Sequence, residues 1–474
     1  TWTCTGTDAN SAAFEINNPN ATLTVKNGKV VSSQLVGLIP SAMGGTIKYD
    51  NSSLEFDGVE MTTTAHSGIE TNGNNTNDTV KLVNSELNVP NGFGIYFPSS
   101  GTLTIDNSVI NAKTMGVQVC AGSLNISGAD TAITVSGDGI DKTINDGAIE
   151  DGAAISIVNR AGYKGLSNIE VKGGTFTAKG DNAAVKAYDW ANQTEGAFDN
   201  SENVVAISGG TFSSAVDKSL CADGYIPTKN TDGTYSVKEG KYVAEIGSQG
   251  YESLTDAVAA AEDGQTVRLL ADATEDVVIS KSITLDLGGK TLTNTNAGKA
   301  TISVTGGTVT VQNGSVIGGT SYYNIEVTKN SNANLTLTDV TATAGNTGSS
   351  MIDNYGTLTI TSGTYNGGLN VVKSEEGSKL TITGGTFTLD YAPSSGYTAV
   401  ILVYGDTTIS GGEFIQTATP KWGYPQVVMT GVVEGYTAIT RVTGGHFVNK
   451  KSGDNIFHGL GKATSDNFKV SGGT

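Results

Sequence analysis

The stretch KLTITGGTFTLD at residues 379–390 carries a pattern that the chain repeats many times. It combines an apolar-Thr-apolar triplet, a Gly-Gly pair and a Thr-Phe pair. Related versions are VKGGTFTA (171–178), AISGGTFS (206–213), TISGGEFI (408–415), RVTGGHFV (441–448) and KVSGGT (469–474). An active site needs its residues once, whereas stacked turns need the same corner in every layer. The repetition therefore predicts a repeat architecture.

The pattern also predicts the local structure of each repeat. Alternation in LTI turns Leu and Ile to one side of a strand and Thr to the other. The glycine pair suits backbone conformations that a Cβ atom disfavours, so it predicts a corner between two short strands. The composition agrees, because the 474 residues include 63 glycines and only 8 prolines, and 16% are charged. Such a chain is expected to be all-β with many turns.

The apolar residue before each corner marks the length of a repeat. In the second half the marker residues are Val311, Leu337, Ile360, Ile382, Ile409, Val442 and Val470, in steps of 22 to 33 residues. In the first half they are Val25, Phe56, Leu82, Ile105 and Ile126, in steps of 21 to 31 residues. These steps predict one solenoid turn per repeat, with insertions placed in loops. The step from Ile126 to Val171 spans 45 residues, which is enough for two turns with AAISIVN (153–159) as the extra strand.

One segment in the middle of the chain breaks the repeat. In GYESLTDAVAAAEDGQTVRLL (250–270), Ser253 and Asp256 form a capping box, and the apolar residues that follow share one helical face. We expect a short α-helix at about 253–262 that covers the open edge of a β-solenoid. Just before it, NTDGTY (230–235) predicts a hairpin.

The chain is therefore expected to contain two tandem modules. The first, 1–240, ends in the closing hairpin, and the second, 241–474, begins with the helical cap. The outer ends show no such caps, so we expect the first module to be incomplete at its N-terminus and the second at its C-terminus.

These features resemble a known family. The recurring SGGTF corners, the opening YVAEIG (242–247) and the first coil VVISKSITLDLGGKTL (277–292) are similar to right-handed parallel β-helix, pectin-lyase-like modules. Such modules occur in large surface proteins of gut Gram-positive bacteria of the clostridial type. The resemblance implies a right-handed parallel β-helix solenoid and a secreted or cell-wall-associated, extracellular location. It implies little about activity, because these modules are often attached to unrelated domains.

Charge and cysteine content narrow the classes of function. The net charge is -18 and both halves are acidic, so no basic stripe is present for nucleic acid or for an anionic membrane. No apolar run approaches the roughly 18 to 20 residues that span a bilayer. The cysteines, Cys4, Cys120 and Cys221, lack metal-ligand spacing and can form at most one disulfide. We expect structural roles for all three.

Aromatic residues in two long steps are the candidate ligand-binding residues. The step before Ile207 contains YDWANQ with Trp190, and the step before Val442 contains KWGYPQ with Trp422 and Tyr424. Long insertions project from one flank of a solenoid, where exposed aromatic rings can stack on sugars. Trp190, Trp422 and Tyr424 are thus predicted to bind host or dietary glycans. In the alternative interpretation, the tryptophans pack their own loops against the coil.

One glycine-rich segment is a candidate metal site. GDGIDKTINDGAIEDGA (137–153) contains Asp138, Asp141, Asp146 and Asp151, and carboxylate oxygens on a flexible loop are ligands that calcium prefers. The spacing does not match an EF-hand, and Asp-Gly pairs are common in turns. A solvated loop without metal is therefore the competing interpretation. No other cofactor is expected.

The functional hypotheses differ in whether the chain has catalytic groups. A β-helix also carries polysaccharide lyases and hydrolases, which need carboxyl groups from neighbouring coils along a groove. The sequence shows no evident acid pair, His66, His446 and His458 stand apart as expected surface residues, and no nucleophile or phosphate-loop motif occurs. The main hypothesis is a non-enzymatic extracellular surface or stalk protein, structural or adhesive, that binds glycans or neighbouring modules of the same chain. The alternative is a polysaccharide-active lyase or hydrolase, and a third hypothesis is a phage spike or a Gram-negative passenger domain.

Overall fold

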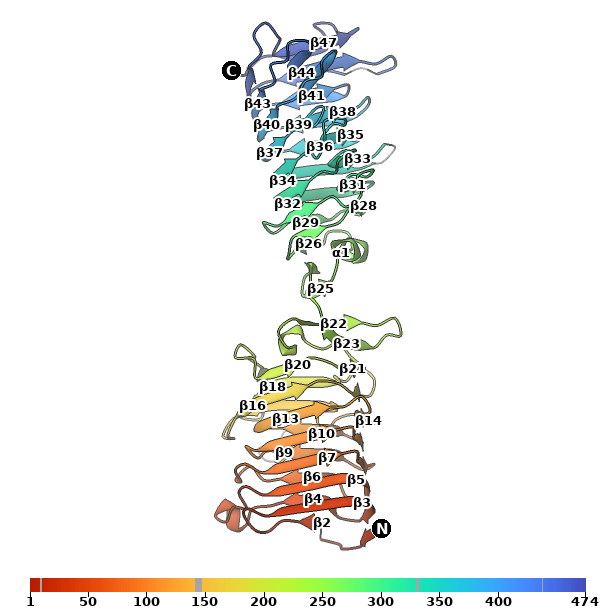
Figure 1. Cartoon of the computed structure of the whole chain (residues 1–474), viewed down its shortest axis with the longest axis vertical. Coiled ribbons are helices and arrows are strands. Elements are labelled where there is room, and N and C mark those ends of the chain that lie inside the picture. Colours follow the sequence, from red (N-terminus) through yellow and green to blue (C-terminus); the bar gives the residue numbers. More distant parts are fainter. Residues whose placement is uncertain (9–10, 141–146, 330–331, 437) are drawn as a thin grey trace. The chain divides into compact units, whose positions relative to one another are not determined.

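The structure is a computed structural model that describes residues 1–474 except 9–10, 141–146, 330–331 and 437. It is almost entirely β, as the repeats predict, and it contains a single α-helix among the described residues. The chain divides into two compact units, unit 1 (Thr1–Lys241) and unit 2 (Tyr242–Thr474). This division falls next to the expected boundary after residue 240. Each unit combines a long sheet with a sheet of eight strands (Figure 1).

The long sheet of unit 1 has 15 strands. They are β1 (Trp2–Cys4), β3 (Thr22–Ser32), β5 (Ser53–Thr63), β7 (Thr79–Val83), β8 (Glu86–Val89), β10 (Thr102–Asp106), β11 (Val109–Ala112), β13 (Gly122–Ser127), β14 (Ala132–Val135), β16 (Leu166–Val171), β17 (Thr175–Thr177), β20 (Val205–Ile207), β21 (Thr211–Phe212), β22 (Tyr225–Lys229) and β23 (Tyr235–Glu239). The eight-stranded sheet contains β2 (Ala12–Glu15), β4 (Leu35–Ile39), β6 (Ser67–Thr71), β9 (Phe93–Phe97), β12 (Met115–Val119), β15 (Ile155–Arg160), β18 (Val185–Ala191) and β19 (Thr194–Ala197). Two 3-10 turns, Met43–Gly45 and Lys218–Leu220, lie between strands.

The long sheet of unit 2 has 17 strands. They are β24 (Ala244–Ile246), β25 (Gln249–Tyr251), β26 (Thr266–Leu269), β27 (Ala273–Thr274), β29 (Thr284–Asp286), β30 (Thr291–Thr293), β32 (Thr308–Ile317), β34 (Asn334–Thr343), β36 (Thr357–Ile360), β37 (Gly363–Asn366), β39 (Lys379–Ile382), β40 (Thr386–Leu389), β42 (Asp406–Ile409), β43 (Glu413–Gln416), β45 (Thr440–Val442), β46 (His446–Asn449) and β48 (Phe468–Val470). The eight-stranded sheet contains β28 (Val277–Ile279), β31 (Ile302–Val304), β33 (Ile325–Val327), β35 (Ile352–Asn354), β38 (Val372–Ser374), β41 (Tyr397–Val403), β44 (Tyr424–Val432) and β47 (Phe457–Gly461).

Within each unit, the chain passes through its strands in sets of three. For example, β10, β11 and β12 are followed by β13, β14 and β15, and each strand pairs in parallel with its equivalent in the next set. The marker residues recognised in the sequence are register partners. Val311, Leu337, Ile360, Ile382, Ile409, Val442 and Val470 pair in succession. The predicted repeat spacing is therefore confirmed at the level of strand register.

The long step in unit 1 was wrongly expected to accommodate two turns. Ile126 pairs directly with Val171, so one turn spans the whole 45-residue step. AAISIVN does supply a strand, β15, but this strand belongs to the same turn as β14. The extra length lies between Val135 and Ile155 as an insertion, because the ladder of hydrogen bonds between turns fixes where each strand must return.

The repeated corner has a definite structural role. The second glycine of the pair has a positive φ, 101° at Gly385 and 103° at Gly412, which a side chain would oppose. The aromatic residue two positions later then points into the unit. The Phe387 ring stacks on Tyr365 and on Phe414, with both centroid distances at 4.9 Å, and Phe414 stacks on Phe447 in the same way. The Gly-Gly-Thr-Phe phrase thus builds an internal column of rings in unit 2.

The two expected end elements are present. Helix α1 (Leu254–Ala260) begins after Ser253, whose hydroxyl accepts a hydrogen bond from the Asp256 amide, and Leu254 and Ala257 are buried. Strands β22 and β23 pair antiparallel as the expected hairpin, and β23 pairs with β21. No helix in the described part of the chain is long and apolar enough to cross a membrane.

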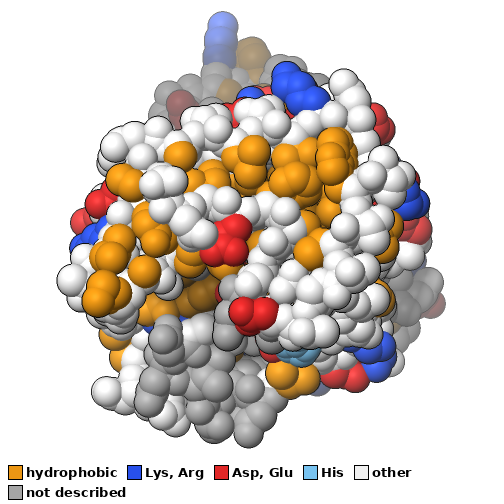
Figure 2. Space-filling view, turned by 90° about the horizontal axis from the view of Figure 1, so that it is seen from below, with side chains coloured by type: hydrophobic (Ala, Val, Ile, Leu, Met, Phe, Trp, Pro, Cys, Tyr) orange, Lys and Arg blue, Asp and Glu red, His pale blue; other side chains and the backbone are white. Residues whose placement is uncertain are grey.

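The N-terminal end of unit 1 is apolar on its surface. Figure 2 views this end and shows hydrophobic side chains gathered across it. Its exposed large hydrophobic residues include Trp2, Val31, Met43 and Ile47. Inside the sheets, each unit has one large apolar core. A smaller apolar cluster lies apart from this core in each unit.

Candidate functional site

Charged residues meet on the outer face of the eight-stranded sheet of unit 2. In β33, β35 and β38 the apolar residues face the core, so strand alternation turns the middle residue outward. The middle residues are Glu326, Asp353 and Lys373, which are register partners on consecutive strands. Because neighbouring strands lie about 4.8 Å apart, these three side chains stand side by side.

Asp353 is the unusual member of this row. Its exposed fraction is 0%, and neither carboxylate oxygen has a hydrogen-bond partner among the described residues. Burial raises the pKa of Asp353 to about 7, the negative charge of Glu375 adds to this rise, and Lys373 opposes it. Burying an ionised carboxylate without donors is costly, so Asp353 favours either a proton or a group that supplies donors.

Two further carboxyl groups complete what we call the carboxylate cluster, Glu326, Asp353 and Glu375. Glu375 is buried and forms an ion pair with the Lys373 ammonium. Glu326 is half-buried, accepts a hydrogen bond from the Ser303 hydroxyl at 3.3 Å, and has a pKa that burial raises. Only Lys373, among the described residues, is in ion-pair contact with the cluster. The cluster thus keeps a negative excess.

Tyrosines surround the cluster. The rings of Tyr322 and Tyr323 lie 4.5 Å apart between centroids. Burial, with the added charge of Glu326 for Tyr322 and of Asp353 for Tyr323, raises the pKa of both hydroxyls. Tyr355 lies beside Glu375, which together with burial raises its pKa. A cavity of about 210 Å³ beside the cluster is lined in part by Tyr322 and Glu326.

Aromatic rings form a second feature on the next three strands of the same sheet. The Tyr397 ring stacks on Tyr424 at 5.1 Å and on His458 at 4.8 Å, both with an interplanar angle of 27°. These residues belong to β41, β44 and β47, and we call them the aromatic platform. Tyr397 is 47% exposed and Tyr424 is 52% exposed, so part of the stack reaches solvent, and the Lys451 ammonium lies over the Tyr424 ring at 5.8 Å.

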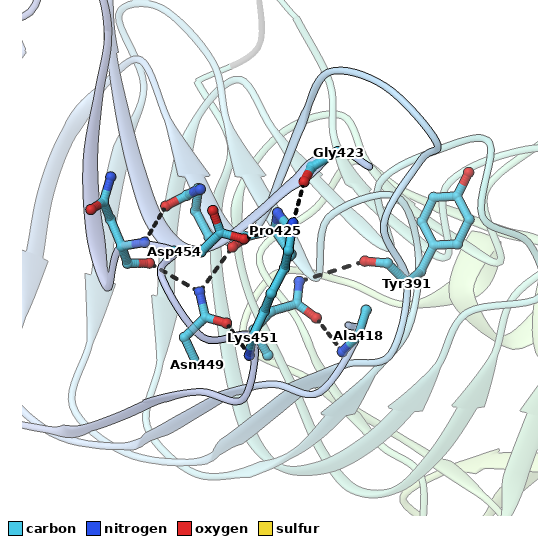
Figure 3. A network of polar contacts seen from close by, with 10 residues as sticks. Tyr391, Ala418, Gly423, Pro425, Asn449, Lys451 and Asp454 are labelled. Carbon is cyan, nitrogen blue, oxygen red and sulfur yellow. Dashed lines mark hydrogen bonds and ion pairs between the residues drawn. The ribbon is translucent and has the colours of Figure 1, made fainter. Parts of the chain in front are cut away.

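Polar contacts hold the platform and its neighbouring loop in place (Figure 3). The Lys451 ammonium donates to the Gly423 carbonyl at 2.6 Å and pairs with Asp454 at 3.1 Å. The Asn449 amide donates to the Pro425 carbonyl at 2.8 Å. Because Gly423 and Pro425 flank Tyr424, these bonds fix the position of its ring. The backbone on both sides of Tyr424 is therefore held in place.

The structure separates the three aromatic residues that the sequence suggested. Trp422, between β43 and β44, is 69% exposed and stands two residues from Tyr424 of the platform. Trp190 is only 5% exposed, because it lies on β18 and packs edge-on against Tyr188 at 6.3 Å. The expectation of an exposed Trp190 is thus wrong. Trp190 is packed against the sheet, as in the alternative interpretation of the sequence.

The acidic segment of unit 1 does not gather as a metal site in the described residues. Asp138 is exposed and pairs with Lys179 at 2.6 Å, and this contact lowers its pKa. Asp151 is buried, and Asp141 and Asp146 lie outside the described residues. No group of three histidine, cysteine, aspartate or glutamate side chains within the described part could hold a metal ion. All three cysteines are free thiols.

Asp151 instead belongs to a covered polar network on the eight-stranded sheet of unit 1. Its carboxylate accepts hydrogen bonds from the Ser156 hydroxyl at 2.6 Å, the Tyr188 hydroxyl at 3.0 Å and the Ala153 amide at 3.0 Å. The adjacent Ile149 exchanges two hydrogen bonds with the Gln118 side chain. Residues 147–151 thus pack against the outer face of this sheet, and we call them the cover segment.

The cover segment also supplies Glu150 and shields Cys120. Glu150 accepts from the Thr114 hydroxyl and contacts the His66 ring nitrogen Nε2 at 2.8 Å. Cys120 and Ile149 are both fully buried in one outer apolar cluster, and burial raises the pKa of the Cys120 thiol to about 12. The described carboxylates of the cover segment therefore have partners, unlike Asp353.

Sequence reasoning missed most of the unit 2 site. Tyr397 had a signal, because GYTAV (396–400) and GYPQV (423–427) align one turn apart. Glu326, Asp353 and Lys373 each interrupt a three-residue strand, IEV, IDN and VKS, and that shared feature was a second signal. His458 carried no local signal. No protein-family model and no curated protein sequence matches the chain.

Proposed function

We propose that unit 2 binds carbohydrate through the aromatic platform and the adjacent Trp422. The observation that carries this proposal is the exposed stack of Tyr397, Tyr424 and His458. Exposed aromatic surface, greatest at Trp422, suits the C–H faces of sugars, and stacked rings lose little freedom on binding. The nearby carboxylate cluster adds acceptors for sugar hydroxyls.

We further propose that both units are right-handed parallel β-helix modules of a bacterial surface protein. Sets of three strands, parallel pairing in register and a repeated glycine corner support the assignment. The resemblance to modules of clostridial-type surface proteins supports an extracellular, cell-wall-associated or secreted location. In this proposal the chain is non-enzymatic and serves as a structural or adhesive element that contacts host or dietary glycans.

Binding to a panel of neutral, acidic and mucin-type oligosaccharides tests the function. Isothermal titration calorimetry with the full chain should find at least one ligand that Tyr424→Ala weakens about tenfold, the effect of roughly 1.4 kcal/mol. Trp422→Ala should weaken the same ligand. Tyr436→Ala is the matched control, because Tyr436 has the same 47% exposure as Tyr397 but lies outside the platform. Equal effects of Tyr424→Ala and Tyr436→Ala would contradict the proposal.

A second candidate function, a polysaccharide-active enzyme, is favoured by the pairing of Glu326 with Asp353. Glycoside hydrolases use two carboxyl groups roughly 5 to 10 Å apart, a range that adjacent strands can supply. Glu326 lines the cavity and burial raises its pKa, which suits a general acid. Reducing-end release that Glu326→Gln abolishes would establish catalysis, whereas binding without release would favour the non-enzymatic function.

A further inference from the structure

We propose that the carboxylate cluster recognises a protonated amine, so that unit 2 prefers glycans with free amino sugars over their N-acetylated equivalents. This inference rests on the proposed carbohydrate binding and adds the chemical class of the ligand. Its basis is the combination of a negative excess, an unpartnered buried carboxylate and a wall of tyrosines at one place on the sheet.

The hydrogen-bonding inventory favours an ammonium group. Glu326, Asp353 and Glu375 offer acceptors, while Lys373 alone contributes charge in direct contact among the described residues. Both oxygens of Asp353 lack a donor in the described structure. An alkylammonium supplies three donors and a positive charge, whereas an acetamido nitrogen supplies a single donor and no charge. An amine therefore suits the negative excess of the cluster better than an acetamido group does.

The surroundings of the cluster determine where the amine lies. Glu326 is half-buried and lines the cavity of about 210 Å³ together with Tyr322, so it is the accessible carboxylate. Lys299 and Asp276 also line this cavity, so with Glu326 its lining holds two carboxylates and one ammonium. The ammonium is therefore expected between Glu326 and the face of Tyr322, a favourable cation–π position.

The cavity volume limits the size of the bound group. Sites for drug-sized ligands are roughly 300–1,000 Å³, so a cavity of about 210 Å³ suits one sugar unit or part of it. The rest of the oligosaccharide must lie along the sheet surface. The aromatic platform, three strands away on the same sheet, is placed to contact that remainder.

Asp353 has a positioning and electrostatic role behind Glu326. It is fully buried, and the groups that face it are Glu326, Lys373, Glu375 and the neighbouring tyrosines. A cation bound at Glu326 favours the ionised form of a nearby carboxyl group. Below the pKa of the sugar amine, where the ligand is already protonated, its binding should thus release protons from the cluster, and a neutral ligand should not.

The test uses β-1,4-linked glucosamine oligomers and the same oligomers in N-acetylated form, with the full chain. Calorimetry below the pKa of the sugar amine should show at least tenfold tighter binding of the glucosamine form. Glu326→Gln should remove this preference. Asp339→Asn is the matched control, because it also removes one negative charge but lies in the long sheet, where Asn313 holds the equivalent position one turn earlier. The control corrects for non-specific attraction to a chain of net charge -18.

Proton release supplies a second readout that a general charge effect would not produce. Titrations in two buffers with different ionisation enthalpies should reveal proton release with glucosamine oligomers, and Asp353→Asn should abolish it. Equal affinities for the two oligomers, or equal effects of Glu326→Gln and Asp339→Asn, would overturn the inference. If the N-acetylated form still binds in a manner that Tyr424→Ala weakens, the proposed function survives that result. If no glycan of the panel binds, both fail.

Discussion

The eight-stranded sheets of the two units carry polar rows on their outer faces, but the rows are treated differently. In unit 1 the cover segment packs on the sheet, and Asp151 of this segment accepts three hydrogen bonds. In unit 2 Glu326 and Lys373 stay half-exposed, and Asp353 between them has no hydrogen-bond partner among the described residues. The geometry of these sheets therefore does not by itself leave a carboxylate without a hydrogen-bond partner.

The difference indicates which face is available for a ligand. A satisfied polar network stabilises and orders a surface, whereas a buried group without a partner destabilises the fold until something satisfies it. Such costs are commonly found at functional sites. The contrast therefore supports the proposal that the outer face of unit 2, rather than that of unit 1, binds the ligand.

The largest expected effect concerns the thiol beneath the cover segment. Burial raises the pKa of Cys120 to about 12, so its thiolate fraction at neutral pH falls by roughly a thousandfold relative to an ordinary cysteine. Alkylation followed by mass spectrometry should show Cys120 protected by at least this factor relative to the denatured chain. Gln118→Ala, which removes both bonds to Ile149, should accelerate labelling. Rapid labelling of the native wild type would show that the face is open.

Next in size is removal of the carboxylate that the cover segment contributes. Asp151→Ala leaves the Ser156 and Tyr188 hydroxyls without their acceptor in a buried position, and we expect a loss of about 3 kcal/mol in the free energy of unfolding of unit 1. Hydrogen exchange of amides in β15 and β18 measures this loss. Asp138→Ala, at an exposed ion pair, is the control and should change stability little. Similar effects of both variants would contradict the network's role.

In unit 2, replacing the buried carboxylate Asp353 is expected to raise stability rather than lower it. The folded pKa of Asp353, about 7, exceeds its unfolded value near 3.8, so the folded state holds the proton more tightly. The contribution of Asp353 to the stability of unit 2 should fall as the pH rises from about 4 to 7 and stay constant above pH 7. The titratable groups around Asp353 are Glu326, Lys373, Glu375, Tyr322, Tyr323 and Tyr355. Asp353→Asn should stabilise unit 2 by about 2 kcal/mol at pH 8 and much less at pH 4.

Hydrogen exchange of β33 to β38 at the two pH values provides the measurement. Asp339→Asn serves again as the control, because its side chain accepts from Ser362 at the surface and asparagine preserves that bond. A variant less stable than wild type at pH 8 would show that Asp353 has partners in solution. The contrast between the two faces would then disappear.

The smallest effect is expected at the edge of the covered face. His66 contacts Glu150 through Nε2, but 56% of its side chain is exposed to solvent, which screens the pair. His66→Ala should lower the stability of unit 1 by about 0.5 kcal/mol, far less than Asp151→Ala. If His66→Ala lowered stability as much as Asp151→Ala, Glu150 rather than Asp151 would be the residue that anchors the cover segment. Denaturant titration of both variants gives the comparison.

The repeats could be predicted from the sequence because every turn has the same pattern of residues. The markers from Val311 to Val470 are register partners, and the capping box at Ser253 starts the helix. The 45-residue step misled because length alone cannot distinguish an extra turn from an insertion. Only the pairing of Ile126 with Val171 decides it.

The site was less accessible because its residues come from different turns. Trp422 and Tyr424 were found as an aromatic pair within one insertion, but Tyr397 and His458 join them only through stacking across strands. Trp190 has the same local appearance as Trp422, yet on β18 it packs edge-on against Tyr188 and is only 5% exposed. Burial of an aromatic residue depends on what packs above the sheet, which local sequence does not encode.

The positive-φ glycine at each corner has a consequence for how such a chain can change in length. Gly385 and Gly412 adopt the same conformation, and Phe387 and Phe414 stack in the same way. The two surfaces of a turn, which pack on the previous turn and on the next one, are therefore alike. A copied turn can therefore be inserted, or one removed, without redesigning its neighbours. Recombination between repeats would lengthen or shorten the column in whole turns, and a binding face on one sheet would be carried along intact.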